Sequence, residues 1–237
     1  MAFAMAGLAS KAQLSIAPTI GYGYAMGNYK EANPNASLDT AFSSKFGFNI
    51  NVGAEAHYRL CKDWSIHSGF FYQYIDTKNG YTNTGSTIDY ERKMNYVSMP
   101  LELVYGKKGI GFYGGAGIDL GFGLGGKVTE SGTNLVSQTT ILVFDGKSIM
   151  DNYDHFNALD LGIALKAGYT FSNNIIVGVD AKIGLNNLSS NPAPYNSGNY
   201  TSYKLTTISA HIGYLLYGPE HHKLKKKKKK VDDFDSQ

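Results

Sequence analysis

The sequence predicts an all-β chain, folded as an eight-stranded antiparallel up-and-down transmembrane β-barrel. Three observations support this prediction. Apolar and polar residues alternate with a period of two over long stretches, which is the period of a strand and not of a helix. The polar face of the longest stretch is mostly glycine, and the connections between the stretches are alternately long and short. A closed barrel whose apolar face meets lipid explains all three.

The hairpin Asn95–Val128 shows the alternation most clearly. Apolar residues occupy every second position of Val97–Tyr105 and, apart from Gly114, of Ile110–Leu124. The opposite face of the second strand is mostly glycine, which weakens a solvent-facing strand but suits the crowded interior of a small barrel. The apolar face must then point outward, toward lipid.

The turn Gly106–Gly109 predicts the register of this hairpin. If the turn pairs Tyr105 with Ile110, counting back along both strands brings Tyr96 opposite Asp119. Both side chains then face the interior of the barrel, because each lies an odd number of residues from an outward position. We therefore expect Tyr96 and Asp119 to face each other.

The same hairpin carries a family resemblance. The strand segment Tyr96–Leu101 reads YVSMPL, and the glycine-rich segment Tyr113–Gly117 follows after the turn. This pattern resembles the PorT-like outer-membrane β-barrel family, the outer membrane protein beta-barrel domain of Bacteroidetes-type bacteria. That family typically shows a Tyr-x-x-Ile-Pro-Leu strand and then a Tyr-x-Gly-x-Gly element, and Met99 stands where it usually has Ile. The resemblance implies an outer-membrane barrel and points to type IX secretion or surface biogenesis.

The chain divides into three parts. Residues 1–12 are interpreted as a truncated signal peptide, because Met1–Ala9 is apolar and small and Ser10–Ala12 is similar to a cleavage site. A buried first strand is the alternative. Residues 13–217 form the barrel. Residues 218–237 are expected to be a disordered, Lys-rich periplasmic tail, and contact with anionic lipid or cell-wall polymer is the alternative.

The barrel part contains eight predicted strands. Aromatic residues lie near both ends of their outward faces, as the two interfaces of a bilayer favour, and the even number places both chain ends in the periplasm. Long loops are expected at 26–45, 79–89, 129–157 and 187–202, the third with some structure of its own at 140–144. The strands are 13–25, 46–60, 64–78, the two strands of the hairpin, 158–171, 175–186 and 203–217.

Composition limits the possible partners. The formal net charge of +3 lies in the tail, since residues 1–217 hold equal numbers of basic and acidic side chains. No basic surface therefore predicts nucleic-acid binding. The single Cys61 cannot form an internal disulfide, and no Cys/His pair has metal-ligand spacing. We expect a monomer whose partners are outer-membrane lipid and other envelope or secretion proteins.

Titratable residues fall on the inward faces of the predicted strands. They predict a charge-compensated lumen, because a cation facing the middle of the bilayer costs about 2–4 kcal/mol. The turn Ser172–Asn174 places Lys166 opposite Asp180 as an ion pair, and His67 also faces inward. No Ser/His/acid signature predicts a catalytic site, so neither enzyme activity nor a cofactor or metal is expected. The predicted lumen network is Glu55, His57, Arg59, Glu102, Asp119, Asp160, Lys166, Asp180, Lys182 and His211.

These patterns predict a protein of the cell outer membrane with a structural or partner-binding role, in secretion or surface biogenesis. Eight strands leave an interior that side chains fill, which argues against a pore. Two alternatives remain open. One is an outer-membrane lipid-modifying enzyme, which needs a Ser, a His and an acid near the outer rim. The other is a soluble lipocalin-like ligand carrier.

Overall fold

The computed structural model describes residues 14–32, 41–83, 86–106, 110–133, 135–145, 154–190 and 200–216. The predicted signal peptide, residues 1–12, and the predicted tail, residues 218–237, lie outside these residues. No helix in the described parts is long and apolar enough to cross a membrane. The strands are β1 (Leu14–Ala32), β2 (Ala41–Lys45), β3 (Gly47–Arg59), β4 (Trp64–Asn83), β5 (Ser86–Gly106), β6 (Gly111–Gly132), β7 (Leu135–Phe144), β8 (Asp154–Phe156), β9 (Leu159–Thr170), β10 (Ile175–Gly184) and β11 (Tyr200–Tyr214).

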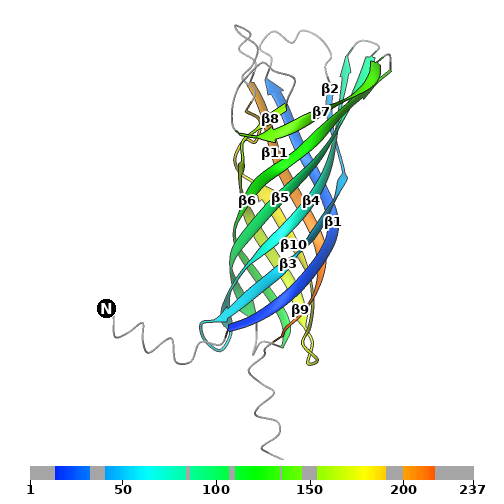
Figure 1. The fold of residues 1–237 in the computed structure, drawn as a ribbon. Coiled ribbons are helices and arrows are strands. Elements are labelled where there is room, and N and C mark those ends of the chain that lie inside the picture. The colour runs from blue at the N-terminus through cyan, green and yellow to red at the C-terminus, as the bar shows by residue number, and fades with distance from the viewer. Residues whose placement is uncertain are drawn as a thin grey trace, which may run out of the picture.

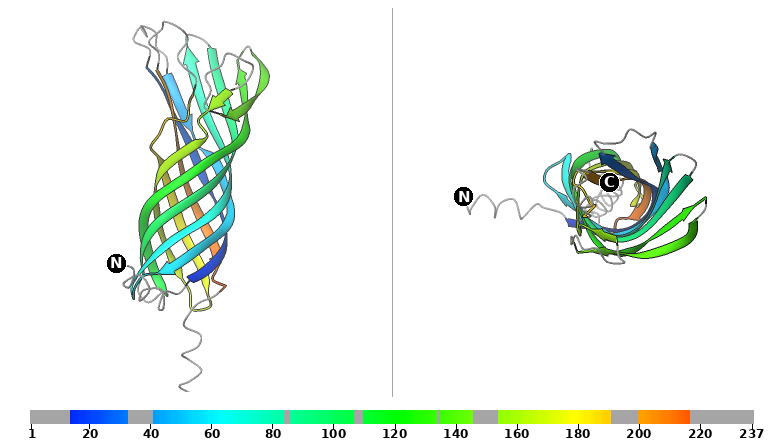
Figure 2. Two further views of the ribbon diagram at one scale, coloured as in Figure 1. Left: turned by 60° about the vertical axis from the view of Figure 1, so that its left-hand side comes forward. Right: turned by 90° about the horizontal axis from the view of Figure 1, so that it is seen from above.

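Eight of these strands close into a barrel, which confirms the predicted fold class. The antiparallel order is β1, β3, β4, β5, β6, β9, β10 and β11, and β11 pairs with β1 to complete the ring. Seen from above, the tilted strands surround a single lumen (Figure 2). Closure gives every ring strand two neighbours, so the barrel wall has no free edge.

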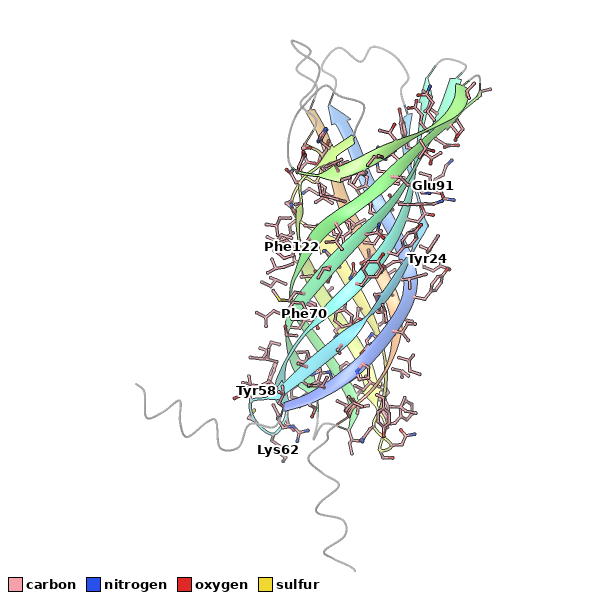
Figure 3. All side chains as sticks on the ribbon, viewed as in Figure 1. Tyr24, Tyr58, Lys62, Phe70, Glu91 and Phe122 are labelled. Atoms are coloured by element: carbon pink, nitrogen blue, oxygen red, sulfur yellow. The ribbon has the colours of Figure 1, made fainter. Side chains whose placement is uncertain are left out.

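The outer face of the wall is apolar and the inner face is polar, as predicted. On β1, Ile20 is 54% exposed whereas the adjacent Thr19 is 8% exposed. The same alternation runs through β3, where Val52 is exposed and Asn51 is buried. In the side view of Figure 3, side chains project outward along both edges of the wall. This arrangement is the reverse of a soluble lipocalin, and only lipid stabilises it.

Aromatic side chains form two belts on the outer wall. Tyr58 lies at the short-turn end, which we call the lower end, and Tyr24 and Phe122 lie higher on the wall, in the direction of the long-loop or upper end (Figure 3). At the lower end Trp64 contacts Tyr105 edge to face, with ring centroids 5.2 Å apart. Amphipathic rings at both levels mark the two interfaces of a bilayer.

The wall is much taller on one side than on the other. The strands β4, β5 and β6 contain 20, 21 and 22 residues, but β9 and β10 contain 12 and 10. The tall side continues above the upper aromatic belt, where β2 pairs with β4 and β7 pairs with β6 (Figure 1). We call β2, β7 and the parts of β4–β6 above the belt the upper extension.

The upper extension corrects the predicted loops. The expected loop 79–89 is mostly strand, since β4 continues to Asn83 and β5 begins at Ser86. The expected loop 129–157 likewise contains the end of β6, all of β7 and β8. Above the membrane neither sheet face meets lipid, so the apolar alternation that reveals the lower strands is lost.

The predicted register of the hairpin β5–β6 is wrong by four residues. Tyr105 pairs with Gly114, Pro100 with Asp119, and Tyr96 with Gly123. The shift is even, so Tyr96 and Asp119 still face the lumen, but they are not opposite each other. The rings at the lower end fit this register, because Tyr105 pairs with Trp64 on β4 while Phe112 pairs with Tyr169 on β9. In this register β5 pairs with β4 and β6 pairs with β9 on their other sides. The connection between the paired parts of β5 and β6 is then longer than the turn Gly106–Gly109 predicted.

An apolar cluster closes the upper lumen. It includes Phe156 of β8 and Leu188, both from segments that fold inward, and Tyr96 and Tyr203 from the wall. Phe144 of β7 contacts the Tyr96 ring at a centroid distance of 5.1 Å. We call this cluster the upper plug; its buried members are Ala25, Ile75, Met94, Tyr96, Val128, Leu142, Phe156, Leu188, Tyr203 and Leu205, with Tyr90 and Phe144 packed against them.

Candidate functional site: the charged lumen

Below the upper plug the lumen is filled by charged and polar side chains in two groups. The lower cluster contains Glu55, His57, His67, Glu102, Lys166, Asp180 and His211. The middle cluster contains Ser98, Asp119, Asp160 and Lys182. Each residue comes from the inward face of a wall strand, so the alternation of the sequence places these groups in the lumen.

Lys166 is the centre of the lower cluster. Its Nζ atom donates to Glu55 across the lumen, and it lies 3.1 Å from Oε2 of Glu102 and 3.6 Å from Oδ1 of Asp180. The predicted pairing of Lys166 with Asp180 in register is confirmed. Asp180 is nevertheless the most distant of the three carboxylates. Burying an ammonium costs desolvation free energy. Several carboxylates around it compensate this cost more completely than a single carboxylate would.

Two histidines lie beside this centre. His57 and His67 pair across β3 and β4, and their rings stack with centroids 3.7 Å apart and planes inclined by 9°. Glu55 lies between them and Lys166. Its Oε2 atom is 3.1 Å from Nε2 of His57 and its Oε1 atom is 3.4 Å from Nδ1 of His67. The carboxylate of Glu55 therefore contacts one ammonium and two imidazoles.

A third histidine completes the far wall of the lower cluster. Nδ1 of His211 lies 2.6 Å from Oδ2 of Asp180, and its Nε2 lies 3.3 Å from the Tyr113 hydroxyl. Tyr113 also approaches His67, with ring centroids 6.1 Å apart. The lower cluster thus extends around the lumen rather than along one hairpin.

The middle cluster is built around Lys182. Its Nζ atom lies 2.9 Å from Oδ2 of Asp160 and 3.3 Å from Oδ1 of Asp119. The hydroxyl of Ser98 donates to Asp119, at 2.8 Å and 3.0 Å from its two oxygens. A cavity of about 50 Å³ lies beside both clusters, with Asn51 and Ser209 in its lining. That volume holds about one or two waters and no larger solute.

The structure places nine of the ten predicted network residues in these two clusters. The tenth, Arg59, lies half-buried at the lower end of β3, opposite Ser65. Sequence reasoning left His67 out of the network, although the turn after Leu60 already sets it opposite His57. It also missed Ser98 and Tyr113, whose hydroxyls complete the two clusters.

A second group of charges lies outside the membrane, on the outer face of the upper extension. Glu91 lies 3.3 Å from Nζ of Lys93 and 3.6 Å from Nζ of Lys78, well above Tyr24 (Figure 3). Burial raises the pKa of Asp76 to about 6, and the Glu91 carboxylate adds to the rise. Burial acts upward on Glu91 too, but Lys93 and Lys78 outweigh it and lower the pKa of Glu91.

The upper rim also carries an acid, a histidine and a serine. Nδ1 of His155 lies 2.8 Å from Oδ1 of Asp145. The Ser190 hydroxyl donates to the main-chain carbonyl of His155. The acid and the imidazole therefore have the spacing of an orienting pair, while the hydroxyl is directed at the backbone.

Comparison with known sequences identifies the family. The sequence profile of the outer membrane protein beta-barrel domain matches residues 9–190. The chain belongs to this family. The protein is therefore an outer-membrane protein, as the aromatic belts and the apolar outer wall also require. Among curated proteins no match is found.

Several solved structures are similar to this chain. Ail of Yersinia pestis, solved in complex with the heparin analogue sucrose octasulfate, is 18% identical, covers 85% of this chain and 98% of its own, and has a TM-score of 0.33. Neisserial surface protein A is 11% identical, with coverage of 86% and 97% and a TM-score of 0.38. The outer membrane protease OmpT from Escherichia coli is 10% identical, with coverage of 85% and 96% and a TM-score of 0.39.

The match to OmpT corrects one expectation. The sequence led us to expect no enzyme activity, but a protease is among the similar barrels. A fold by itself neither implies nor excludes catalysis. At this level of similarity the match assigns no reaction to this chain.

Proposed function

We propose that the protein is a partner-binding barrel of the outer membrane, which acts as a monomer and recognises an extended segment of another envelope protein through its upper extension. The observation that carries the proposal is the strand β7. The extension raises β7 above the upper aromatic belt, on the side of the long loops, which we take to be extracellular.

The outer edge of β7 has the properties of a binding edge. Within the described residues, only Leu142–Phe144 pair with another strand on that side, through β8. Val136 is 86% exposed and Ile141 is 57% exposed. The strand sequence LVSQTTILVF contains no charge and no proline. Proteins normally blunt such edges with charge, proline or a covering segment. An extended peptide that adds one more strand would satisfy the backbone groups of this edge.

The filled lumen supports a binding role over transport. The two charged clusters occupy its lower and middle parts, and the upper plug closes the rest. The resemblance of Tyr96–Leu101 to PorT-like barrels supports placing the partner in secretion or surface biogenesis.

Crosslinking in intact cells tests the proposal. A photo-crosslinking amino acid in place of Val136 should yield a product of defined mass, and Ile141→Lys should reduce its yield at least fivefold. Ser131→Lys, which adds the same charge at an exposed position of β6, should leave the yield unchanged. The same crosslinker in place of the lipid-facing Phe70 controls for random contact. Absence of a product at Val136, or a product with twice the mass of this chain, would overturn the proposal.

The rim residues favour a second candidate, an outer-membrane lipid-modifying enzyme. Asp145 and His155 have the required pair geometry, and Ser190 is adjacent through the hydrogen bond of its hydroxyl to the His155 carbonyl. Purified barrel should then release fatty acid from phospholipid micelles, and Ser190→Ala or His155→Gln should abolish the release. Equal release by both variants and the parent protein would exclude this candidate.

A further inference from the structure

We propose that Glu55, His57 and His67 form a binding site for one divalent transition-metal ion, of which Zn²⁺ fits the ligands best. Their ligand atoms all lie within 4.8 Å of one another in the lower lumen. Two imidazoles and one carboxylate are a ligand set that zinc uses when a fourth position stays open. This inference goes beyond the proposed function and does not depend on it.

The backbone already brings the three ligands together. Glu55 and His57 are two residues apart on β3, so both face inward, and the tight turn to β4 places His67 directly opposite His57. Ligands of a tetrahedral zinc ion, at about 2.0–2.1 Å from the metal, are about 3.4 Å apart. The carboxylate lies at 3.1 Å from one imidazole and 3.4 Å from the other. Small rotations of the two rings would close the set.

The two imidazole nitrogens that face Glu55 are buried and poorly satisfied. Neither Nε2 of His57 nor Nδ1 of His67 has a hydrogen-bond partner of good geometry, although His67 is more than nine-tenths buried. Buried polar atoms of this kind normally have a partner. A metal ion between them and Glu55 would supply it.

A neighbouring hydroxyl fixes the orientation of one ligand. Oγ of Ser65 lies 3.0 Å from Nε2 of His67. When Nε2–H donates to Ser65, Nδ1 carries the lone pair and points toward Glu55. Metal-bound histidines usually have such an outer partner on the second ring nitrogen.

The charges of the lower cluster favour a cation. Three carboxylates, those of Glu55, Glu102 and Asp180, surround the single ammonium of Lys166. The stacked rings of His57 and His67 cannot both be protonated without repulsion at 3.7 Å. A divalent ion on neutral imidazoles removes the excess negative charge without that cost.

The choice of metal follows from the donors. Lys166 contacts Oε1 of Glu55, which leaves Oε2 for the metal on the histidine side. Nitrogen donors favour zinc and related transition metals over Ca²⁺ and Mg²⁺, which need oxygen ligands. The side chain of His57 is 14% exposed and gives the site its contact with solvent at the lower end.

Metal titration of the full chain, refolded in detergent micelles and freed of metal with chelator, tests the proposal. After dialysis against Zn²⁺ the wild-type barrel should retain one equivalent by elemental analysis, and Co²⁺ should give the intense visible absorption of a tetrahedral site. His57→Ala and His67→Ala should each weaken Zn²⁺ binding about 100-fold or more, and Ser65→Ala about tenfold. His67→Gln serves if the alanine variant fails to show the heat-modifiable migration of a folded barrel.

Two controls separate this site from other histidines. His211→Ala removes a buried lumen histidine outside the trio and should keep one equivalent. The double change His221→Ala and His222→Ala, in the tail sequence, should keep it as well. Retention of one equivalent by a folded His57→Ala/His67→Ala protein, loss with the tail variant, or no Zn²⁺ bound by the folded wild type would each overturn the proposal.

Discussion

The lower lumen and the upper mouth are packed by different chemistry, although the same strands line both. Around Lys166 the interior is held by ion pairs that cross the lumen from several strands. Around Tyr96 it is held by apolar contacts with Phe144, and Phe156 packs against Tyr203 nearby. The lower cluster is built from the wall alone, whereas the plug also needs β7, β8 and Leu188, which lie outside the ring. The comparison predicts that the lower part responds to charge and the upper part to volume.

Removing the central ammonium should have the largest effect. Lys166→Met leaves the buried carboxylates of Glu55 and Glu102 without their cation, and breaking a buried ion pair costs about 3–5 kcal/mol. The urea midpoint of the barrel refolded in micelles should fall accordingly. Adding Glu55→Gln and Glu102→Gln to the same protein should recover part of the loss. Adding Asp180→Leu alone should recover less, because Asp180 is the most distant partner and a third of its side chain is exposed. An unchanged midpoint for Lys166→Met would contradict the charge-dominated lower lumen.

A cavity in the upper plug should have the next largest effect. Leu188 is fully buried, so Leu188→Ala should lower the same midpoint by the equivalent of about 2–5 kcal/mol. Leu188→Met keeps the volume and should cost less than about 1.5 kcal/mol. Equal losses for the alanine and methionine variants would show that volume does not control this region.

The difference between the two regions also explains what the sequence could predict. The inward positions of Lys166 and Asp180, and their register, follow from the period of two and a tight turn at which Asn174 adopts φ of 70°. The contact of Lys166 with Glu55 could not follow, because it joins β9 to β3 across the closed ring. Pairing rules describe neighbouring strands only. The pairing of His57 with His67 could have been predicted from the sequence, because it depends only on the register set by the tight turn between β3 and β4.

The upper plug was not predictable in the same way. Phe144, Phe156 and Leu188 come from segments that read as loops or loop borders, and inside the mouth they pack against residues of the barrel wall. Gly123 illustrates this dependence, since a Cβ there would lie 2.2 Å from Cδ1 of Phe144. The glycine pattern indicated a crowded interior, but not which side chain fills the space. The predicted register at Tyr96 was wrong for a related reason. It considered the hairpin alone, whereas β5 also pairs with β4 and β6 also pairs with β9.

A smaller effect is expected in the middle cluster, between the two regions. The Ser98 hydroxyl donates to the buried carboxylate of Asp119, so Ser98→Ala should cost about 1.5–3 kcal/mol. Ser44→Ala is a matched control, because that hydroxyl donates to the uncharged carbonyl of Gly27, and it should cost about 0.5–1.5 kcal/mol. Urea midpoints of the two variants, measured in the same micelles, give the comparison. A larger loss for Ser44→Ala would argue that Asp119 is satisfied by Lys182 alone.

The smallest effect should appear outside the membrane, in the charged group on the outer face of the upper extension. The pKa of Asp76 is raised to about 6 by burial and by Glu91, while an unfolded Asp has a pKa of about 3.9. The folded upper extension therefore binds the proton more tightly than the unfolded chain. Its stability should rise as the pH falls from about 6 toward about 4, and above about pH 6 the buried charge should weaken it.

Asp76→Asn isolates this contribution, because asparagine keeps a donor for Glu91 and carries no charge near Lys78 and Lys93. Hydrogen-exchange protection in the upper parts of β4 and β5, corrected for the intrinsic exchange rate, should be higher in the variant than in the wild type at pH 7.5. The two proteins should converge at about pH 4, where Asp76 is protonated in the folded state. The lower strands serve as the internal reference in the same spectra, since Asp76 touches none of the lumen clusters. Protection that is flat with pH in the wild type, or lower in the variant at pH 7.5, would mean that Lys78 and Lys93 hold Asp76 ionised despite its burial.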